Sequence, residues 1–389
     1  DVYKRQGPLP LVAKSGQEDK VFAVSSTNNL DARYFTNDFV ANEVEPPRRT
    51  PRESLASLKP RSGFKVELVV AEPLVMDPID VAWGADGKVW VVEMPDYPLG
   101  MSEDGHLGPP VPLGIPGGRV RFLEDTDGDG RYDKSTVFLE SIGFPTGVKP
   151  WRKGVMVTAA PEVFYAEDTD GDGRADFRKP LFTGFNIRHS QLLVNHPRWG
   201  LDNWVYMANG WSGGKIRSVK TGTVTDIDGR DLRVRVDEGL VDAQAGPAQY
   251  GRDRDDWGNW FGLNNAHPGW HYVLADHYLR RNPHFAAPTA RLNVTPDRDV
   301  YPIGRVLSYW SKAPPPLSEG EPGFWTALCG LMIYRDDLFG PAYAGNLFMC
   351  DSIFNVLHRK VLTPNGVTFR GERAPDERKS EFLLSLIHI

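Results

Sequence analysis

The sequence predicts an all-β fold in which small antiparallel sheets repeat along the chain, as in a β-propeller. One observation is a perfect repeat: the seven residues Asp-Thr-Asp-Gly-Asp-Gly-Arg occur at 125–131 and again at 168–174. A second is composition, because 39 Gly and 32 Pro in 389 residues favour short strands joined by turns over long helices. A repeated unit of this size is typical of propellers and related arrays of sheets.

Each copy of the repeat lies between two runs that have the alternating pattern of strands. Residues 121–124 and 134–139 flank the first copy, and residues 163–167 and 177–182 flank the second. Alternation of apolar and polar residues over such short runs indicates half-buried strands. We therefore expect two β-hairpins, each with an acidic loop at its tip.

The acidic loops have the ligand pattern of a calcium site. Carboxylates at alternate positions can converge on one hard cation, while Gly130 and Gly173 allow the sharp turn. The loops are not EF-hands, because Thr136 and Lys179 stand where a bidentate glutamate belongs. The alternative, that Asp and Gly only cap tight turns, stays open. The expected metal ligands are Asp125, Asp127, Asp129, Asp133, Asp168, Asp170, Asp172 and Asp176.

Charge and cysteine content exclude several classes of function. A net charge of −6 without a long Lys/Arg cluster argues against nucleic acid as the main partner. The two cysteines, Cys329 and Cys350, form no Cys-x-x-Cys motif, so no haem or zinc site is expected in this stretch. They open and close two neighbouring strand-like runs, so a disulfide and two buried thiols both remain open.

The chain divides into four segments. Residues 1–6 and 384–389 can be encoded by one DNA sequence and its reverse complement, so we interpret both as adapter-derived. Residues 7–53 are polar and aperiodic and are expected to form an irregular linker. A short helix is expected after Thr50, with Pro51 at its first position and Glu53 at its third. Residues 54–383 form the propeller domain.

Within this domain a turn rich in Gly, Asp or Asn, followed by about four aromatic or β-branched residues, recurs five times. The spacing is uneven, with long insertions expected at 96–116 and 267–324, which argues against a regular WD-type repeat. The five units are residues 84–92, 151–157, 200–207, 256–262 and 344–349.

The ordered motifs resemble those of the PVC-type membrane-bound dehydrogenase domain, which is similar to the glucose/sorbosone dehydrogenase propeller. The resemblance covers residues 54–383 and implies a six-bladed propeller of the soluble quinoprotein glucose dehydrogenase type. Because five units are visible, we expect a truncated propeller of about five blades, incomplete at its C-terminus. The resemblance rests on the acidic hairpins and on residues 63–73, 86–94, 199–206, 250–258 and 345–350.

The resemblance also implies a site. Pyrroloquinoline quinone would lie over the central channel, with His189 as the general base that takes the proton of a substrate hydroxyl. Arg252 would pair with quinone oxygens or carboxylates, and Arg188, Asn209 and Trp211 complete the expected cofactor-binding set. The alternatives are that His189 is bonded locally and that Arg252 belongs to a solvated run of charges.

Two functions follow as expectations. The first is an exported, periplasmic or membrane-associated oxidoreductase that oxidises a sugar or polyol by hydride transfer to the quinone. A downstream haem domain or a cytochrome would then accept the electrons. The second is a non-catalytic, calcium-stabilised propeller that binds carbohydrate or a partner domain, since fold alone does not separate the two.

Overall fold

The computed structural model describes residues 9–13, 20–24, 50–58, 60, 62–95, 97, 116–282, 284, 286, 288–301, 322–354 and 356–384. Of the residues expected to be adapter-derived, 1–6 and 385–389 lie outside this part of the chain, whereas Leu384 is described as part of a strand. Most of the expected insertion at 96–116 also lies outside it. No described helix is long and apolar enough to cross a membrane.

Five antiparallel sheets of four or more strands make up most of the described chain. The first contains β3 (Pro78–Trp83), β4 (Val89–Glu93), β5 (Gly118–Glu124) and β6 (Lys134–Ile142). The second contains β7 (Gly147–Trp151), β8 (Gly154–Ala159), β9 (Glu162–Glu167), β10 (Phe177–Phe185), β13 (Gly214–Ser218) and β14 (Val224–Asp226). The third contains β11 (Asn195–Trp199), β12 (Val205–Ala208), β15 (Asp231–Arg235) and β16 (Leu240–Gln244).

The fourth sheet contains β17 (Arg252–Arg254), β18 (Trp260–Asn264), β19 (His267–Tyr272) and β20 (Arg291–Asn293). The fifth contains β23 (Leu328–Ile333), β24 (Leu347–Asp351), β25 (Val356–Asn365), β26 (Thr368–Glu372) and β27 (Leu383–Leu384), the last of which pairs with β25. The smaller elements are β1 (Leu9–Ala13), β2 (Lys20–Val24), α3 (Pro51–Ser57), α4 (Asp276–Leu279), β21 (Asp299–Val300), β22 (Gly323–Phe324) and the 3-10 turn Pro375–Glu377.

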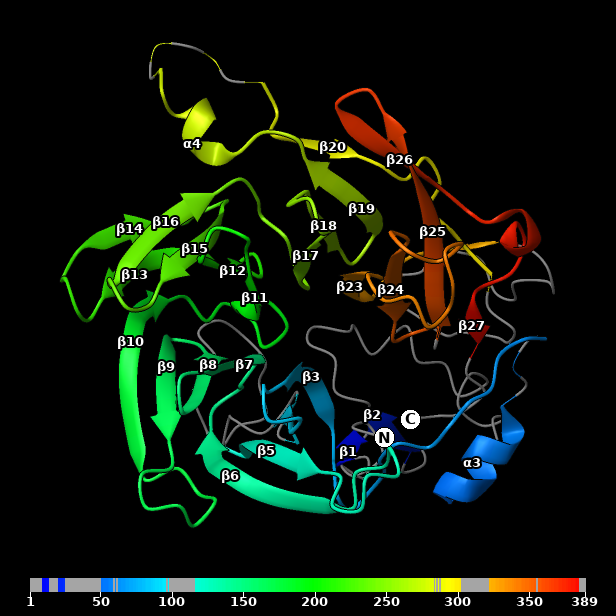
Figure 1. The fold of residues 1–389 in the computed structure, drawn as a ribbon, viewed down its shortest axis with the longest axis horizontal. Helices are drawn as coiled ribbons and strands as arrows, with labels where there is room; N and C mark the ends of the chain where they lie inside the picture. The colour runs from blue at the N-terminus through cyan, green and yellow to red at the C-terminus, as the bar shows by residue number, and fades with distance from the viewer. Residues whose placement is uncertain are drawn as a thin grey trace.

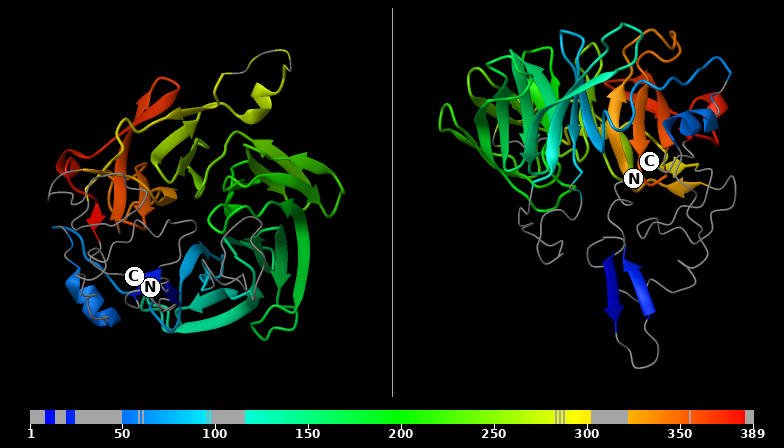
Figure 2. Two further views of the ribbon diagram at one scale, coloured as in Figure 1. Left: turned by 180° about the vertical axis from the view of Figure 1, so that it is seen from behind. Right: turned by 90° about the horizontal axis from the view of Figure 1, so that it is seen from below.

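The five sheets follow one another around a central axis (Figure 1). Their first strands are innermost, and β3 contacts β7, β7 contacts β11, β11 contacts β17 and β17 contacts β23. Seen edge-on in Figure 2, the sheets form one layer around this axis. The predicted all-β, propeller-type fold is therefore confirmed, whereas the blade count, expected to be about five of a six-bladed type, stays a prediction.

The hydrophobic core lies between neighbouring sheets. Phe122 and Phe164 belong to a cluster that joins the first and second sheets, and Met156 and Met207 to one that joins the second and third. Tyr206 and Trp260 join the third and fourth sheets, while a further cluster with Phe261 joins the fourth and fifth. Middle strands such as β8 and β12 are buried along their whole length because both of their faces are covered.

All five turn-strand units expected from the sequence supply the second strand of a sheet, namely β4, β8, β12, β18 and β24. The expectation for 267–324 was wrong in part, because β19 and β20 of the fourth sheet lie there. Residues 7–53 are also less irregular than expected, since they include the hairpin β1–β2. The capping box of α3 is confirmed: Glu53 N donates to Thr50 Oγ1 at 3.2 Å, and Thr50 N donates to Glu53 Oε2 at 2.7 Å.

The two acidic loops are the tips of the hairpins β5–β6 and β9–β10, as predicted. They also dock in the same way. Ala175 N of the second loop donates to Phe138 O of β6 at 2.8 Å, and Tyr132 N, at the matching position of the first loop, donates to Val69 O at 3.0 Å. The segment around Val69 therefore binds the acidic loop of the first sheet in the same way as β6 binds the acidic loop of the second sheet.

Candidate functional site

Loops that lead into the inner strands meet at one end of the axis. We call this set the entry rim: the residues immediately before β7, β11, β17 and β23 (143–146, 186–194, 245–251 and 325–327). Hydrogen bonds join successive loops of the rim, because Thr146 Oγ1 donates to Val194 O and Asn195 Nδ2 donates to Gln249 O at 2.7 Å. Asn265 N donates to Gln249 Oε1 at 3.1 Å and Leu328 N donates to Asn265 O at 3.2 Å. The rim is therefore a continuous hydrogen-bonded support.

His189 lies in this rim, between β10 and β11, and is partly buried. Its Nδ1 accepts a hydrogen bond from Gln191 N at 3.1 Å. Burial lowers the pKa of His189, so the ring is neutral at pH 7. With Nδ1 as acceptor, Nε2 carries the proton, and a role as base at Nε2 requires the other tautomer, in which Nδ1 gives up the bond from Gln191.

Arg188 and Trp211 lie close to His189 because the loop 209–213 packs on the loop 186–194. Arg188 N donates to Ser212 Oγ at 3.4 Å, and Ser212 Oγ donates to Leu192 O. The side chains of Arg188 and Trp211 are exposed, and the Arg188 guanidinium lies 4.0 Å from Asp228 Oδ1. An exposed pair at this distance leaves the Arg188 charge largely available to a ligand.

The first sheet also reaches this group. Tyr97, in the connection that follows β4, accepts a hydrogen bond at its hydroxyl from Gln191 Nε2. Gln191 thus contacts His189 through its backbone and Tyr97 through its side chain. Tyr97 and Gln191 were not predicted as site residues, because nothing in their local pattern shows that they meet.

Asn209 does not line an open surface. It is 2 % exposed, and its Nδ2 donates to Ile227 O at 2.7 Å and to Arg230 O at 2.6 Å, while its Oδ1 accepts from Gly213 N at 2.8 Å. Every polar atom of this amide therefore holds a neighbouring turn in place.

Arg252, expected to bind the cofactor, is also interior, so the alternative that it belongs to a solvated run of charges is wrong for this residue. It is 2 % exposed, and its Nη1 lies 3.1 Å from Asp231 Oδ2. Its guanidinium lies 4.4 Å from the ring of Tyr272 and 5.0 Å from that of Trp260. The Nη1 of Arg252 is therefore engaged at the junction of the third and fourth sheets, whereas its buried Nε has no hydrogen-bond partner in the described structure.

Ionisable residues that were not among the predicted site residues line the inner strands. Asp80 on β3 accepts from Arg198 Nη2 on β11 at 3.1 Å and from Val148 N at 3.2 Å, and His196 Nδ1 lies 3.8 Å from Asp80 Oδ1. The side chain of Lys149 on β7 makes no hydrogen bond or ion pair to a described residue, although the charges of Asp80 and Asp253 act on it. Each of these inner strands has a charged residue within a short run that otherwise has the pattern of a strand. That charged residue is the sequence signal that could have identified them.

Burial shifts the pKa values of this inner group in the directions that favour the uncharged forms. It raises the pKa of Asp80, against the opposing charge of Arg198, and lowers the pKa of His196 well below its usual value. It also lowers the pKa of Lys149, reinforced by Arg198, and raises the pKa of Asp253 on β17. Such groups are concentrated in functional sites, although structural ion pairs produce them as well.

Each acidic loop brings three carboxylates together. One oxygen of each of Asp125, Asp127 and Asp129 lies within 4.8 Å of the others, and the same holds for the second cluster of Asp168, Asp170 and Asp172. The fourth expected ligand stands apart in both, because the oxygens of Asp133 and Asp176 accept from the backbone and hydroxyl of Thr126 and Thr169.

The alternative role of these loops as capped turns also has support. Asp125 Oδ1 accepts from Gly128 N at 2.8 Å and Oδ2 from Gly130 N at 2.9 Å, and Asp168 repeats both bonds with Gly171 and Gly173. The bond from Gly130 is the main cause that lowers the pKa of Asp125. The bonds and the clusters are compatible, because each carboxylate has further lone pairs.

Solved structures similar to this chain include sugar dehydrogenases at low identity. The pyranose dehydrogenase PQQ domain from Coprinopsis cinerea, in its holo form, is 11% identical with a TM-score of 0.46, over 85% of this chain and 87% of that one. The soluble aldose sugar dehydrogenase from Escherichia coli, in its apo form, is 12% identical with a TM-score of 0.41, over 76% and 86%. A catalytically inactive virginiamycin B lyase from Staphylococcus aureus is 9% identical with a TM-score of 0.37, over 79% and 73%.

No curated protein matches the sequence. A sequence family described as a domain of unknown function, DUF7133, matches residues 50–386, which include all five large sheets and both acidic loops. The chain therefore belongs to the DUF7133 family.

Proposed function

We propose that the chain is an oxidoreductase of the PVC-type membrane-bound dehydrogenase kind, which oxidises a sugar or polyol with a bound quinone. The observation that carries the proposal is His189, a histidine kept neutral by burial on the entry rim. The ordered motifs that resemble quinoprotein dehydrogenases support the same proposal. The proposal also includes export to the periplasm or the membrane. A haem domain or a cytochrome would accept the electrons.

The residues of the rim fit the quinone in part. Arg188 and Trp211 are exposed beside His189, and they offer a guanidinium for a carboxylate and a ring face for a planar group. Asn209 and Arg252 do not fit a direct role, because both are 2 % exposed, Asn209 holds neighbouring turns and Arg252 pairs with Asp231. When bound, pyrroloquinoline quinone would supply the acceptor for a hydride from the substrate carbon.

The chain's own residues would bind the substrate and move its proton. In the tautomer that has the proton on Nδ1, His189 takes the hydroxyl proton at Nε2 as the hydride leaves the same carbon. The bond between Tyr97 and Gln191 fixes the loop that carries His189. Arg188 supplies positive charge at the edge of the rim.

Quinone binding and turnover are separable tests of this proposal. We expect pyrroloquinoline quinone to bind, followed by its absorbance, and a redox dye to be reduced when aldoses or polyols are added. His189→Gln should abolish dye reduction and leave quinone binding unchanged, whereas Arg188→Gln should weaken binding. Arg178→Gln, an exposed arginine on β10, is the matched control and should change neither. Failure of the quinone to bind would contradict the proposal.

A second candidate function rests on the two aspartate clusters. If calcium binds them and no quinone binds, the chain is instead a calcium-stabilised propeller that binds carbohydrate or a partner domain through the entry rim. Three clustered carboxylates per loop, with oxygens of the kind that calcium prefers, favour this candidate. Direct measurement of carbohydrate binding without turnover would support it.

A further inference from the structure

A cavity of about 210 Å³ lies beside α4, next to the outer strand β16 of the third sheet. Its volume exceeds the roughly 150 Å³ of an engineered cavity that holds benzene, so a small organic molecule fits. The walls come from the turn before β15, the chain after β16, α4 and the start of β20. The lining residues are Gly229, Arg230, Ala245, Gly246, Asp276, Leu279, Thr289, Ala290 and Arg291.

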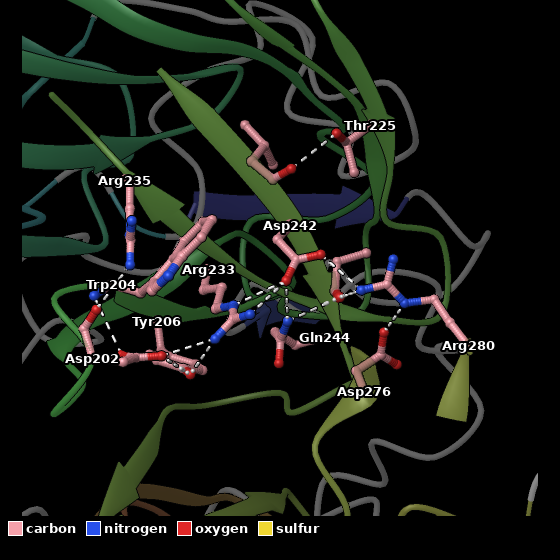
Figure 3. A network of polar contacts seen from close by, with 12 residues as sticks. Asp202, Trp204, Tyr206, Thr225, Arg233, Arg235, Asp242, Gln244, Asp276 and Arg280 are labelled. Atoms are coloured by element: carbon pink, nitrogen blue, oxygen red, sulfur yellow. Dashed lines mark hydrogen bonds and ion pairs between the residues drawn. The ribbon is translucent and has the colours of Figure 1, made fainter. Parts of the chain in front are cut away.

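Positive charge around this cavity exceeds negative charge. Asp276 is the one carboxylate among the lining residues, and it is already paired twice, with Arg230 Nη2 and with Arg280 Nε. Arg280 also bridges to Asp242 at 2.7 Å, as Figure 3 shows. Arg291 has no carboxylate partner in the described part of the chain. Its Nη1 donates to Pro247 O at 3.3 Å, and its guanidinium lies 4.5 Å from the ring of Trp270.

Both arginines are held in place before any ligand arrives. The ring of Trp270 supports the Arg291 guanidinium, and Asp276 pairs with Arg230 Nη2. The Nε of Arg230 is buried and has no hydrogen-bond acceptor in the described structure. This covered donor does not face the cavity, but the Arg230 side chain is partly exposed as a whole, so its positive charge acts on a ligand there.

Several of the other residues that line the cavity are small and offer polar groups. Thr289 offers a hydroxyl, and Gly229 and Gly246 leave the backbone uncovered. A Cβ at Gly246 would lie 2.4 Å from Asp231 N, so glycine is required where this chain passes the start of β15. Hydroxyl and peptide groups of this kind suit a ligand that carries hydroxyls as well as a charge.

We propose that this cavity binds a small hydroxylated carboxylate, of the size and chemistry of a sugar acid. Arg291 and Arg230 receive the carboxylate, and Thr289 with the exposed peptide groups contacts the hydroxyls. The site is separate from His189 and from the aspartate clusters, so it adds to the proposed function and does not depend on it.

Calorimetric titration of the purified chain with sodium gluconate tests this site, with glucose and inorganic phosphate at matched ionic strength as comparators. We expect gluconate to bind with a stoichiometry of one, glucose not to bind, and phosphate to bind more weakly. Arg291→Gln should weaken gluconate binding by about tenfold or more, because a hydrogen bond to a charged group contributes about 1.5–3 kcal/mol. Arg281→Gln removes a neighbouring exposed charge as the matched control and should have no effect.

A second variant tests the cavity without changing charge. Ala290→Leu should fill the space and abolish gluconate binding while the far-ultraviolet circular dichroism stays unchanged. Absence of gluconate binding to the wild-type chain would overturn the proposal. Binding that survives both Arg291→Gln and Ala290→Leu would also overturn it, since the ligand would then lie elsewhere. Equal affinity for phosphate would overturn the assignment to a carboxylate.

Discussion

Arg252 and Asp231 form an ion pair inside the ring, with Arg252 Nη1 3.1 Å from Asp231 Oδ2. Asp231 is fully buried, and it also accepts hydrogen bonds from Asn209 N, Ala248 N and Tyr272 Oη. Because Asp231 begins β15 and Arg252 begins β17, the pair joins the third and fourth sheets. Its role is therefore structural in the first instance.

Replacing Arg252 by methionine should lower the free energy of unfolding by about 3–5 kcal/mol, because it leaves a buried carboxylate without its counter-charge. Burial already raises the pKa of Asp231, and the Arg252 charge opposes that rise. Without Arg252 the pKa should rise further. A carboxyl whose pKa is raised in the folded state makes the free energy of unfolding fall as pH rises. The stability lost through Arg252→Met should therefore be larger at about pH 8 than at about pH 5. Urea denaturation of both proteins at each pH measures it.

Arg335→Met is the matched control, because Arg335 pairs with Asp256 at 3.1 Å in an exposed position. That change should cost less than about 1 kcal/mol. A loss for Arg252→Met no larger than that of the control, or one that is independent of pH, would show that the pair does not hold the sheets together.

The sequence was sufficient to predict the strands that have strong local patterns. The runs that became β4 and β8 are mainly apolar, and both strands are buried over their whole length because neighbouring sheets cover both faces. The strands that it missed are short and polar, such as β20 and β14, and they exist because longer neighbours offer an edge to pair with. Such pairing depends on tertiary context more than on propensity.

The candidate site was predictable only where residues of the required type lie close together in the sequence. The acidic loops were located because their carboxylates are close in sequence, and the structure clusters three in each loop. Arg252 and Asn209 were expected at an open site, whereas their partners Asp231 and Ile227 bury them, and no local pattern reveals those partners. For the same reason the contact of Asp80 with Arg198 was missed, since it joins strands that are distant in sequence.

Calcium should raise the melting temperature of the chain if the aspartate clusters bind it. A ligand that binds only the folded state stabilises it by mass action, so the shift should grow with calcium concentration. Asp127→Asn combined with Asp170→Asn should remove most of the shift, because each cluster loses a charged oxygen. Differential scanning fluorimetry with calcium and with chelator measures it.

Asp86→Asn is the control for this series, because Asp86 is an exposed carboxylate in the turn before β4 and belongs to neither cluster. It should leave the calcium shift intact. Identical melting temperatures of the wild-type chain with calcium and with chelator would leave only the capped-turn interpretation.

Cys329 and Cys350 are direct partners on β23 and β24, which confirms that they lie on neighbouring strands. Opposed Cα atoms in an antiparallel pair are about 4.5–5.5 Å apart, which is within the range of a disulfide. Both are free thiols here. Burial raises the pKa of Cys329 to about 12, so air oxidation should be slow and a disulfide catalyst or diamide is needed.

Oxidation should therefore produce an intramolecular disulfide, detected by mass spectrometry, and raise stability by about 3 kcal/mol on the chain-entropy model. Cys329→Ser should show no change with oxidant. Two thiols that stay titratable after diamide treatment would mean that the strands hold the sulfur atoms apart.

Acid should destabilise the fifth sheet through His358, which is 1 % exposed on β25. His358 Nδ1 bonds to Glu381, and Arg373 Nη2 lies 2.9 Å from the other oxygen of that carboxylate. Burial lowers the pKa of His358 from 6.5 to about 4. The Glu381 carboxylate opposes this shift, and the positive charges of Arg373 and Lys360 add to it. His358 is therefore neutral in the folded state, and its Nε2 has no hydrogen-bond partner in the described structure.

Between pH 6.5 and about 4, the unfolded chain binds a proton at His358 that the folded chain does not. The free energy of unfolding should therefore fall with decreasing pH by about 1.4 kcal/mol per pH unit from this residue, and the slope should vanish below the folded pKa. His358→Asn keeps a donor near Glu381 but does not titrate, so it should remove this part of the slope even if its overall stability is lower. His277→Asn, an exposed histidine on α4, should keep the wild-type slope. Urea denaturation across this pH range measures all three proteins, and an unchanged slope in His358→Asn would mean that another group controls the acid response.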